Sequence, residues 1–188
     1  KGKVVGVSGP SGVGKSTIVR EALRRTDAKY SVSLTTRPPR EGEVDGRHYR
    51  FVDRRTFEKM VASGEMLEWA EVFGELYGTP SEPVLQAVDA GSTIVLEIDV
   101  QGGLQVHEKL PEAELVLVVP PDEKTLAERL GGRGTENADA LGRRLAKANE
   151  EIAAAEKSGI YRHRVVNDDL DQAVRRLVEI VNQESAKA

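Results

Sequence analysis

The chain has 188 residues, of which 39% are hydrophobic and 31% are charged, a balance typical of one globular domain with its own core. Lys and Arg number 27 against 31 Asp and Glu, so the net charge of -4 lacks the basic excess of a nucleic-acid-binding protein. The absence of cysteine excludes disulfides and zinc–thiolate sites, and no apolar run approaches the roughly 18 residues of a membrane span, so we expect a cytoplasmic protein without a nucleic-acid or membrane partner.

Five short apolar runs along the chain predict β-strands. They occupy residues 4–7, 30–34, 93–98, 115–119 and 164–166. Segments with helical periodicity alternate with them, among them residues 138–155 and a last helix at about 171–184. This alternation predicts an α/β fold of three layers, in which helices cover both faces of a mostly parallel five-stranded sheet.

Two segments interrupt this pattern. Residues 33–82 are rich in Arg, Gly, Pro and aromatic residues, with strand-like pieces at 48–52 and 66–73 around a short helix at 55–63. We interpret them as a subdomain inserted into the sheet topology. Residues 129–144 contain the stretch RLGGRGTE, which is typical of a mobile flap. The core of this single domain would then comprise residues 1–32, 83–128 and 145–188.

The stretch SGPSGVGKST, residues 8–17, directly follows the first predicted strand. Two glycines four residues apart, followed by Lys and Ser, form the phosphate-loop pattern, in which backbone N–H groups and a helix N-terminus surround phosphate oxygens. The predicted loop comprises Gly9, Pro10, Ser11, Gly12, Val13, Gly14, Lys15, Ser16 and Thr17. Lys15 would reach the β- and γ-phosphates and Ser16 would bind magnesium. The sequence therefore predicts a P-loop NTPase fold; the alternative is a glycine-rich turn that binds nothing.

A second motif, Asp99-x-x-Gly102, follows the predicted strand at 93–98. GTPases carry the same motif after a strand, but they also need an Asn-Lys-x-Asp element to recognise guanine, and this chain has none. A regulatory GTPase is therefore disfavoured. Asp99 could equally be a strand-end carboxylate that caps the next helix.

Arginines and tyrosines of the inserted segment predict a second phosphate site. Arg37 and Arg40 flank two prolines, which stiffen the loop and hold both guanidinium groups in a fixed relation. Tyr49 and Tyr77 add hydroxyl donors. Such a set suits a phosphate that needs several planar donors. The alternative interpretation is a solvated run of charges.

Several further motifs occur together and in order. They are Ser33-x-x-Thr36-Arg37-x-x-Arg40, Asp45-Gly46-x-x-Tyr49-x-Phe51-Val52, Glu68-Trp69-Ala70, Tyr77-Gly78-Thr79, Asp99-x-Gln101-Gly102, Arg133-Gly134-Thr135-Glu136 and Val166-Asn167-Asp168-Asp169. With the phosphate loop, this set resembles the guanylate kinases, enzymes that phosphorylate GMP to GDP at the expense of ATP. The similarity runs from about residue 3 to residue 181.

This resemblance implies roles for individual residues. Arg37, Arg40, Tyr49 and Tyr77 match positions that hold the GMP phosphate. Ser33, Glu68 and Thr79 match guanine contacts, and Asp99 belongs with them or with the magnesium shell. The phosphate loop, Arg133 and Asn167 match positions that bind ATP, with magnesium as the cofactor. The transfer of the phosphoryl group would depend on Lys15, Arg37, Arg133 and Arg144. The last two belong to a lid at residues 129–144, and residues 33–82 would bind GMP.

Two other functions share this architecture. Guanylate-kinase-like domains of scaffold proteins bind phosphopeptides without turnover, but they typically have eroded phosphate loops, whereas Lys15 and Ser16 are present here. A kinase for AMP or thymidylate gives no reason for the pairing of Glu68 with Ser33. The substrates expected are thus ATP and GMP. The sequence leaves the oligomeric state open, with a monomer or a dimer plausible.

Overall fold

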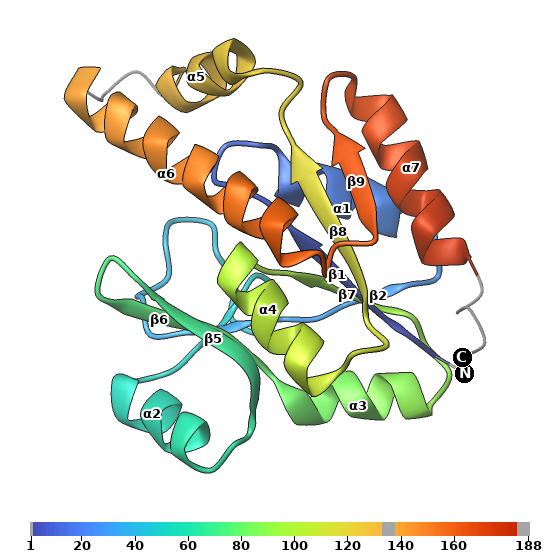
Figure 1. The fold of residues 1–188 in the computed structure, drawn as a ribbon. Helices are drawn as coiled ribbons and strands as arrows, with labels where there is room; N and C mark the ends of the chain where they lie inside the picture. The colour runs from blue at the N-terminus through green and yellow to red at the C-terminus, as the bar shows by residue number, and fades with distance from the viewer. Residues whose placement is uncertain (1, 133–137, 184–188) are drawn as a thin grey trace.

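A computed structural model of the chain describes residues 2–132 and 138–183. Within these residues, one sheet consists of the five strands β1 (Val4–Ser8), β2 (Lys29–Tyr30), β7 (Ile94–Glu97), β8 (Glu114–Val119) and β9 (His163–Val166). Their order is β2-β7-β1-β8-β9, and each pair of neighbours runs parallel (Figure 1). The mostly parallel five-stranded sheet predicted from the sequence is confirmed.

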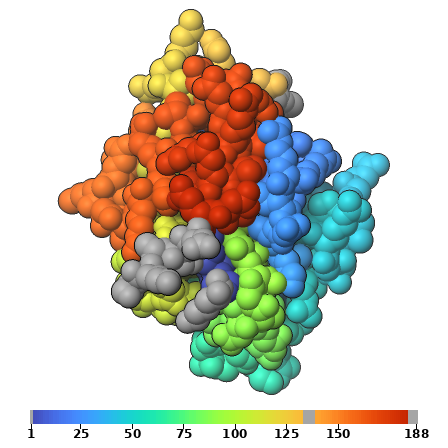
Figure 2. Space-filling view, turned by 90° about the vertical axis from the view of Figure 1, so that its right-hand side faces the viewer, coloured from blue at the N-terminus to red at the C-terminus, as the bar shows by residue number. Residues whose placement is uncertain are grey.

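Helices cover both faces of this sheet because successive strand residues point to opposite sides. Val5 and Val7 pack on one side against α1 (Lys15–Leu23) and α7 (Leu170–Asn182). Figure 2 shows the α7 region directly against the α1 region on the outside of the molecule. The opposite face carries α3 (Ser81–Asp89), α4 (Val100–Lys109) and α6 (Ala138–Ser158). The three-layer α/β architecture is therefore confirmed.

The inserted segment forms a second, smaller sheet with its own core. Its strands in the described chain are β3 (Leu34–Thr35), β4 (Arg50–Phe51), β5 (Met66–Val72) and β6 (Glu75–Pro80), in the order β4-β3-β6-β5. The helix α2 (Arg54–Ala62) places Phe57 between Leu34, Met66 and Leu76. These residues pack on one another and form the core of the small sheet (Figure 1).

The single strand predicted at residues 30–34 is wrong. The chain leaves the large sheet after β2, where the Ser31 amide donates to Val95, and joins the small sheet at β3, where Ser33 accepts from the Arg50 amide. The backbone thus changes its pairing partner within two residues. The apolar pattern of residues 30–34 cannot reveal this change of partner, because the residues on both sides of it favour extended backbone.

The helix α5 (Glu123–Gly131) is capped by Asp122, whose carboxylate accepts from the Thr125 amide at 2.7 Å. It packs on α6 through Leu126 and Leu130. The helix α6 continues without a break through residue 145, where the sequence places the boundary between lid and core. That boundary and the other predicted divisions stay predictions.

Candidate active site

The predicted phosphate loop joins β1 to α1 at the carboxyl edge of the large sheet. Gly14 is the N-cap of α1 and has a φ of 96°, a left-handed conformation that glycine adopts without strain. A Cβ atom at Gly14 would lie 2.5 Å from Asn167 Nδ2. Asn167 is buried, and its amide donates to the Val13 carbonyl at 2.8 Å. Asn167 therefore supports the loop from β9, and glycine is required where the two meet.

Lys15 and Ser16 lie at the start of α1, beside the end of β7. The Lys15 ammonium donates to the carbonyls of Gly9 at 2.5 Å and Pro10 at 3.1 Å. Burial lowers the pKa of Lys15, and nearby carboxylates, Glu97 foremost, oppose that shift. The Ser16 hydroxyl donates to Glu97 at 2.5 Å. A cation, a hydroxyl and a carboxylate thus meet at one point.

The sequence analysis did not identify Glu97. Its signal was present, since an acidic residue stands near the end of the buried strand TIVLEI, and parallel strands end at the same edge of a sheet. Val7 and Glu97 are register partners on β1 and β7. This register brings the Glu97 carboxylate to the phosphate loop, 81 positions away from Ser16 in the chain.

Three of the four residues predicted to hold a phosphate gather on the small sheet. Arg37 Nε donates to the Tyr77 hydroxyl at 3.2 Å, and the guanidinium group lies 5.4 Å from the centre of the Tyr49 ring. The Tyr49 and Tyr77 rings are 6.0 Å apart in an edge-on arrangement. The fourth residue, Arg40, lies three positions further on an exposed turn. The structure therefore assembles a cationic, hydroxyl-rich group.

Glu43 holds this group together, and the sequence analysis missed it as well. Its carboxylate accepts two bonds from Arg37, at 2.8 and 3.0 Å, and one from the Arg40 amide at 2.7 Å. These bonds, those from Arg37 first, lower the pKa of Glu43 to about 2. Glu43 thus occupies the face of Arg37 that could otherwise take a phosphate, and its position in a charged loop gave no sign of this.

A buried carboxylate lies elsewhere on the same sheet. Glu68 on β5 is only 5% exposed, and it accepts from the hydroxyl of its register partner Thr79 on β6 at 2.6 Å. Burial raises the pKa of Glu68 to about 7, although the Thr79 bond opposes the shift. A carboxyl group held in so little water can accept N–H donors of a ligand strongly. Ser33, also predicted to belong here, is half-buried between the sheets.

Asp99 is the N-cap of α4, where its carboxylate accepts from the Gly102 amide at 2.6 Å. Capping is the alternative that the sequence left open, and a ligand contact stays a prediction. Asp99 raises the pKa of Glu68 further, behind burial, so the two acids lie close enough to interact.

The predicted lid residues are only partly described. Arg133 lies outside the described residues. Arg144 is on α6, with Nη1 3.5 Å from the Leu130 carbonyl. Arg129 donates from Nη2 to the Asn167 carbonyl at 2.9 Å, while its Nη1 is buried with no hydrogen-bond partner among the described residues. Arg129 is therefore attached to the phosphate-loop side of the molecule.

The charge of Glu97 affects the pKa of residues both in the phosphate loop and in the group around Arg37. After burial, the charge of Glu97 is the largest cause that raises the pKa of Tyr49, and Glu97 also acts on Lys15. The Glu97 carboxylate therefore acts electrostatically on a residue of each group. Each group offers cationic or hydroxyl donors that suit an anionic ligand.

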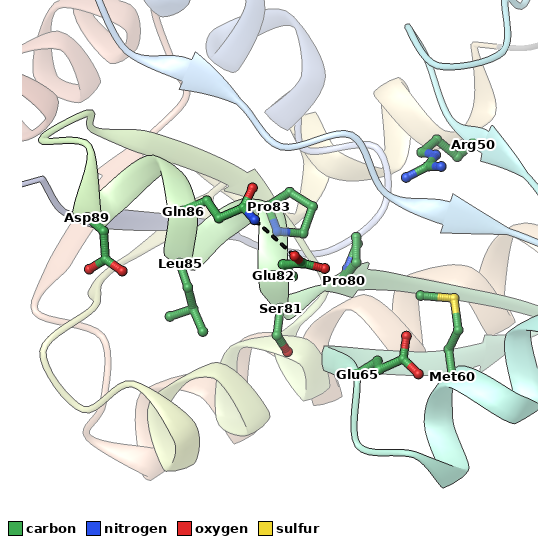
Figure 3. Close-up of a pocket in the computed structure, with 10 residues that line it drawn as sticks. All are labelled: Arg50, Met60, Glu65, Pro80, Ser81, Glu82, Pro83, Leu85, Gln86 and Asp89. Carbon is green, nitrogen blue, oxygen red and sulfur yellow. Dashed lines mark hydrogen bonds between the residues drawn. The ribbon is translucent and has the colours of Figure 1, made fainter.

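An open depression of about 360 Å³ is lined by other residues (Figure 3). Residues of α3, among them Glu82, Leu85 and Asp89, line it together with Met60 and Glu65. It contains none of the predicted site residues, so it is not part of the candidate site. Among the described helices, none combines the length and the apolar character needed to cross a membrane.

Comparisons with known proteins agree on one family. The guanylate kinase family model matches residues 1–184. A guanylate kinase of Gloeobacter violaceus is 51% identical over 95% of this chain and 86% of its own length. One of Carboxydothermus hydrogenoformans is 46% identical over 100% of this chain and 91% of its own. The crystal structure of a guanylate kinase from Anaplasma phagocytophilum superimposes with a TM-score of 0.80 at 33% identity, covering 99% of this chain and 87% of that one.

Proposed function

The chain belongs to the guanylate kinase family, and from this membership we propose that it transfers the γ-phosphate of ATP to GMP, giving ADP and GDP. A phosphate oxygen of GMP bonds to the γ-phosphorus while the bond to the leaving ADP oxygen breaks. The observation that carries this proposal is the buried Glu68 carboxylate on the same small sheet as the Arg37 group. Together they suit a ligand with a base at one end and a phosphate at the other.

The donor side of the site is the phosphate loop. Its backbone N–H groups and the N-terminus of α1 offer positive potential to the ATP phosphates. Lys15 at present donates to Gly9 and Pro10, and β- and γ-phosphate oxygens would replace these carbonyls. Asn167 supports the loop through Val13. These residues bind ATP and orient its γ-phosphate toward the small sheet.

The acceptor side is the small sheet. Arg37, Tyr49 and Tyr77 would hold the GMP phosphate, with Arg40 joining from its exposed turn. Glu68 would accept from guanine N1–H and the exocyclic amine, with Thr79 and Ser33 beside it. Adenine has a lone pair at N1 and would leave the buried carboxylate unpaired, so discrimination on the order of 10⁴-fold is within physical reach.

The residues beside the phosphate loop also fit magnesium. The Ser16 hydroxyl and the Glu97 carboxylate are hard oxygen ligands in direct contact, and Mg²⁺ usually takes one or two such ligands together with phosphates and water. Within residues 2–132 and 138–183, no cluster of three or more acidic or histidine side chains could hold a metal, which suits an ion that arrives with ATP. When bound, magnesium neutralises charge on the phosphates.

Transfer requires charge stabilisation and the exclusion of water more than a strong base. Lys15 and Arg37 supply positive charge from the two sides of the reacting phosphate. Arg133 and Arg144 would add charge over ATP, and an arginine delivered to the transferring phosphate is worth roughly 10³-fold or more in rate. Nothing here favours the phosphopeptide-binding alternative, since Lys15 and Ser16 are both present, with Lys15 bonded to the phosphate loop and Ser16 bonded to Glu97 of β7. The cytoplasmic location stays a prediction.

A nucleotide panel tests this function. We expect rapid ADP release in a coupled assay with ATP and GMP, a slower reaction with dGMP, and little reaction with AMP, CMP or TMP, because only guanine pairs with Glu68. A reaction without acceptor measures background ATP hydrolysis. Equal turnover of AMP and GMP would contradict the guanine assignment, and binding of GMP without ADP release would favour a non-catalytic module.

A further inference from the structure

The strand β5, which carries Glu68, lies at the edge of the small sheet. Its inner edge pairs with β6, with a register shift between Met66 and Glu68. An edge strand presents alternate N–H and C=O groups outward, and these need partners. On β5 the outer groups face α4, a helix packed on the large sheet that lies alongside β5 in Figure 1.

Side chains of α4 supply these partners on both sides of Glu68. The Gln105 amide accepts from the Trp69 N–H at 3.1 Å and donates to the Trp69 carbonyl at 2.8 Å, as a neighbouring strand would. Lys109 donates to the Met66 carbonyl at 2.7 Å. The irregular stretch of β5 is therefore fixed to α4 one residue after Glu68 and two residues before it.

The Glu68 side chain also lies directly against α4. A Cβ atom at Gly102 would be 2.6 Å from Glu68 Oε2, while Thr79 donates to the other oxygen, Oε1. No side chain larger than hydrogen fits at Gly102 unless the buried carboxylate moves. The carboxylate thus has one oxygen fixed by Thr79 and the other fixed by the surface of α4.

We infer that α4 positions the Glu68 carboxylate for the guanine base. Gln105 does so by bonding the Trp69 backbone next to Glu68, and Gly102 does so because its missing side chain leaves room for the carboxylate. This inference rests on the proposed function. It makes Gln105 a positioning residue for base specificity, since its amide is placed to contact β5 rather than the ligand.

The connection also reaches the ATP side. The helix α4 begins at Val100, separated by two residues from β7, whose last residue Glu97 accepts from Ser16 of the phosphate loop. One continuous segment, residues 94–109, therefore contacts the phosphate loop at one end and the guanine-binding strand at the other.

The substitution Gln105→Met tests the inference because methionine keeps the length of the side chain and removes both bonds to Trp69. We expect KM for GMP to rise roughly tenfold, the equivalent of one to two hydrogen bonds, while kcat changes less than about twofold. The matched control is Gln86→Met on α3, whose amide donates to Glu82 on the surface. This control should keep the wild-type KM for GMP.

The preference of the enzyme for GMP over IMP distinguishes a positioning role of Gln105 from a general structural role. IMP has the N1–H of guanine but lacks the exocyclic amine, so a displaced Glu68 should lose much of the preference for GMP over IMP. We expect this preference, measured as the ratio of kcat/KM values and as the ratio of Kd values in calorimetric titrations, to fall several-fold in Gln105→Met. Gln105→Glu keeps the acceptor for the Trp69 N–H and loses the donor, and it should be intermediate.

Gly102→Ala provides a second variant that acts on the carboxylate directly, and it should lower the same preference at least as much. The inference is overturned if Gln105→Met keeps the wild-type KM for GMP, or if it weakens GMP and IMP equally. A wild-type enzyme that does not use GMP at all would instead overturn the proposed function, so the two failures are distinguishable.

Discussion

At the scale of single residues, Glu68 combines a cost in stability with a role in recognition. The carboxylate is buried, and its pKa lies near 7 instead of the usual 4.5. Between these two pH values the folded protein holds a proton that the unfolded chain has lost. The contribution of Glu68 to stability is therefore present below about pH 4.5 and is lost as the pH rises through 7.

Glu68→Gln should accordingly stabilise the fold in alkaline solution and weaken GMP binding. The neutral amide removes a desolvated charge, with a gain on the order of 2 kcal/mol above pH 7 and a much smaller gain near pH 5. Urea denaturation at pH 5 and pH 8.5 measures this difference. A variant equally stabilised at both pH values would show that the Glu68 charge is not the cause.

The same residue sets the pH dependence of the reaction. In the wild type, kcat/KM for GMP should fall about tenfold per pH unit below pH 7, as the Glu68 carboxylate of the free enzyme is protonated. The phosphate of GMP takes up its second proton near pH 6 and contributes below that value. In Glu68→Gln only the protonation of the GMP phosphate remains, so kcat/KM should begin to fall at a pH about one unit lower than in the wild type. Identical profiles would contradict this assignment.

At the scale of elements, the phosphate loop depends on β9. Asn167 donates to Val13 in the middle of the loop, and its carbonyl accepts from Arg129 of α5. Three elements that are far apart in the chain thus meet at one buried amide. The loop conformation needed to bind phosphate is a property of this contact as well as of the loop glycines.

Asn167→Ala should therefore raise KM for ATP while it leaves KM for GMP nearly unchanged. Loss of the bond leaves the Val13 carbonyl without its partner, which costs roughly 1–3 kcal/mol, the equivalent of about 5- to 150-fold in affinity. Steady-state kinetics with each substrate varied in turn measure the two constants. Asn182→Ala, at the exposed end of α7, is the matched control. An equal rise in both KM values would indicate general unfolding instead.

At the scale of the whole molecule, the small sheet has a core of its own, and Leu67 of β5 also packs into the core of the large sheet. Phe57 is fully buried among Leu34, Met66 and Leu76 of the small sheet. Leu177 is buried in the core under α1 and α7. A change in one core should therefore be felt first by the ligand that its own sheet binds.

Phe57→Ala removes the centre of the small core, at a cost of about 3–5 kcal/mol. We expect GMP turnover to be lost while a fluorescent ATP analogue still binds, and hydrogen exchange to accelerate in residues 34–80 before it does in β1 or β8. Leu177→Ala removes a side chain from the core under α1 and α7, so this variant, unlike Phe57→Ala, should impair binding of the ATP analogue. Simultaneous loss of both ligands in Phe57→Ala would show that the two sheets unfold as one unit.

Much of the fold was predictable because its signals are local. The buried strands around residues 4–7, 93–98 and 115–119 are apolar runs, and the glycine spacing of residues 9–14 specifies a phosphate loop directly after a strand. The strand predicted at 30–34 was wrong because the chain passes from one sheet to the other there. Glu43 was missed because an acidic residue in a charged loop carries no distinctive pattern, whereas Glu97 had a signal in its position near the end of a buried strand.

The sequence by itself determined the three-layer α/β fold, the phosphate loop and the family, because each is encoded in neighbouring residues or in motifs with fixed spacing. Tertiary structure alone decided that Glu97 meets Ser16, that Glu43 holds Arg37, and that Gln105 closes the edge beside Glu68. The physical reason is strand register and helix packing. They bring together polar groups whose partners lie outside any local pattern, and burial then determines how strongly these groups interact.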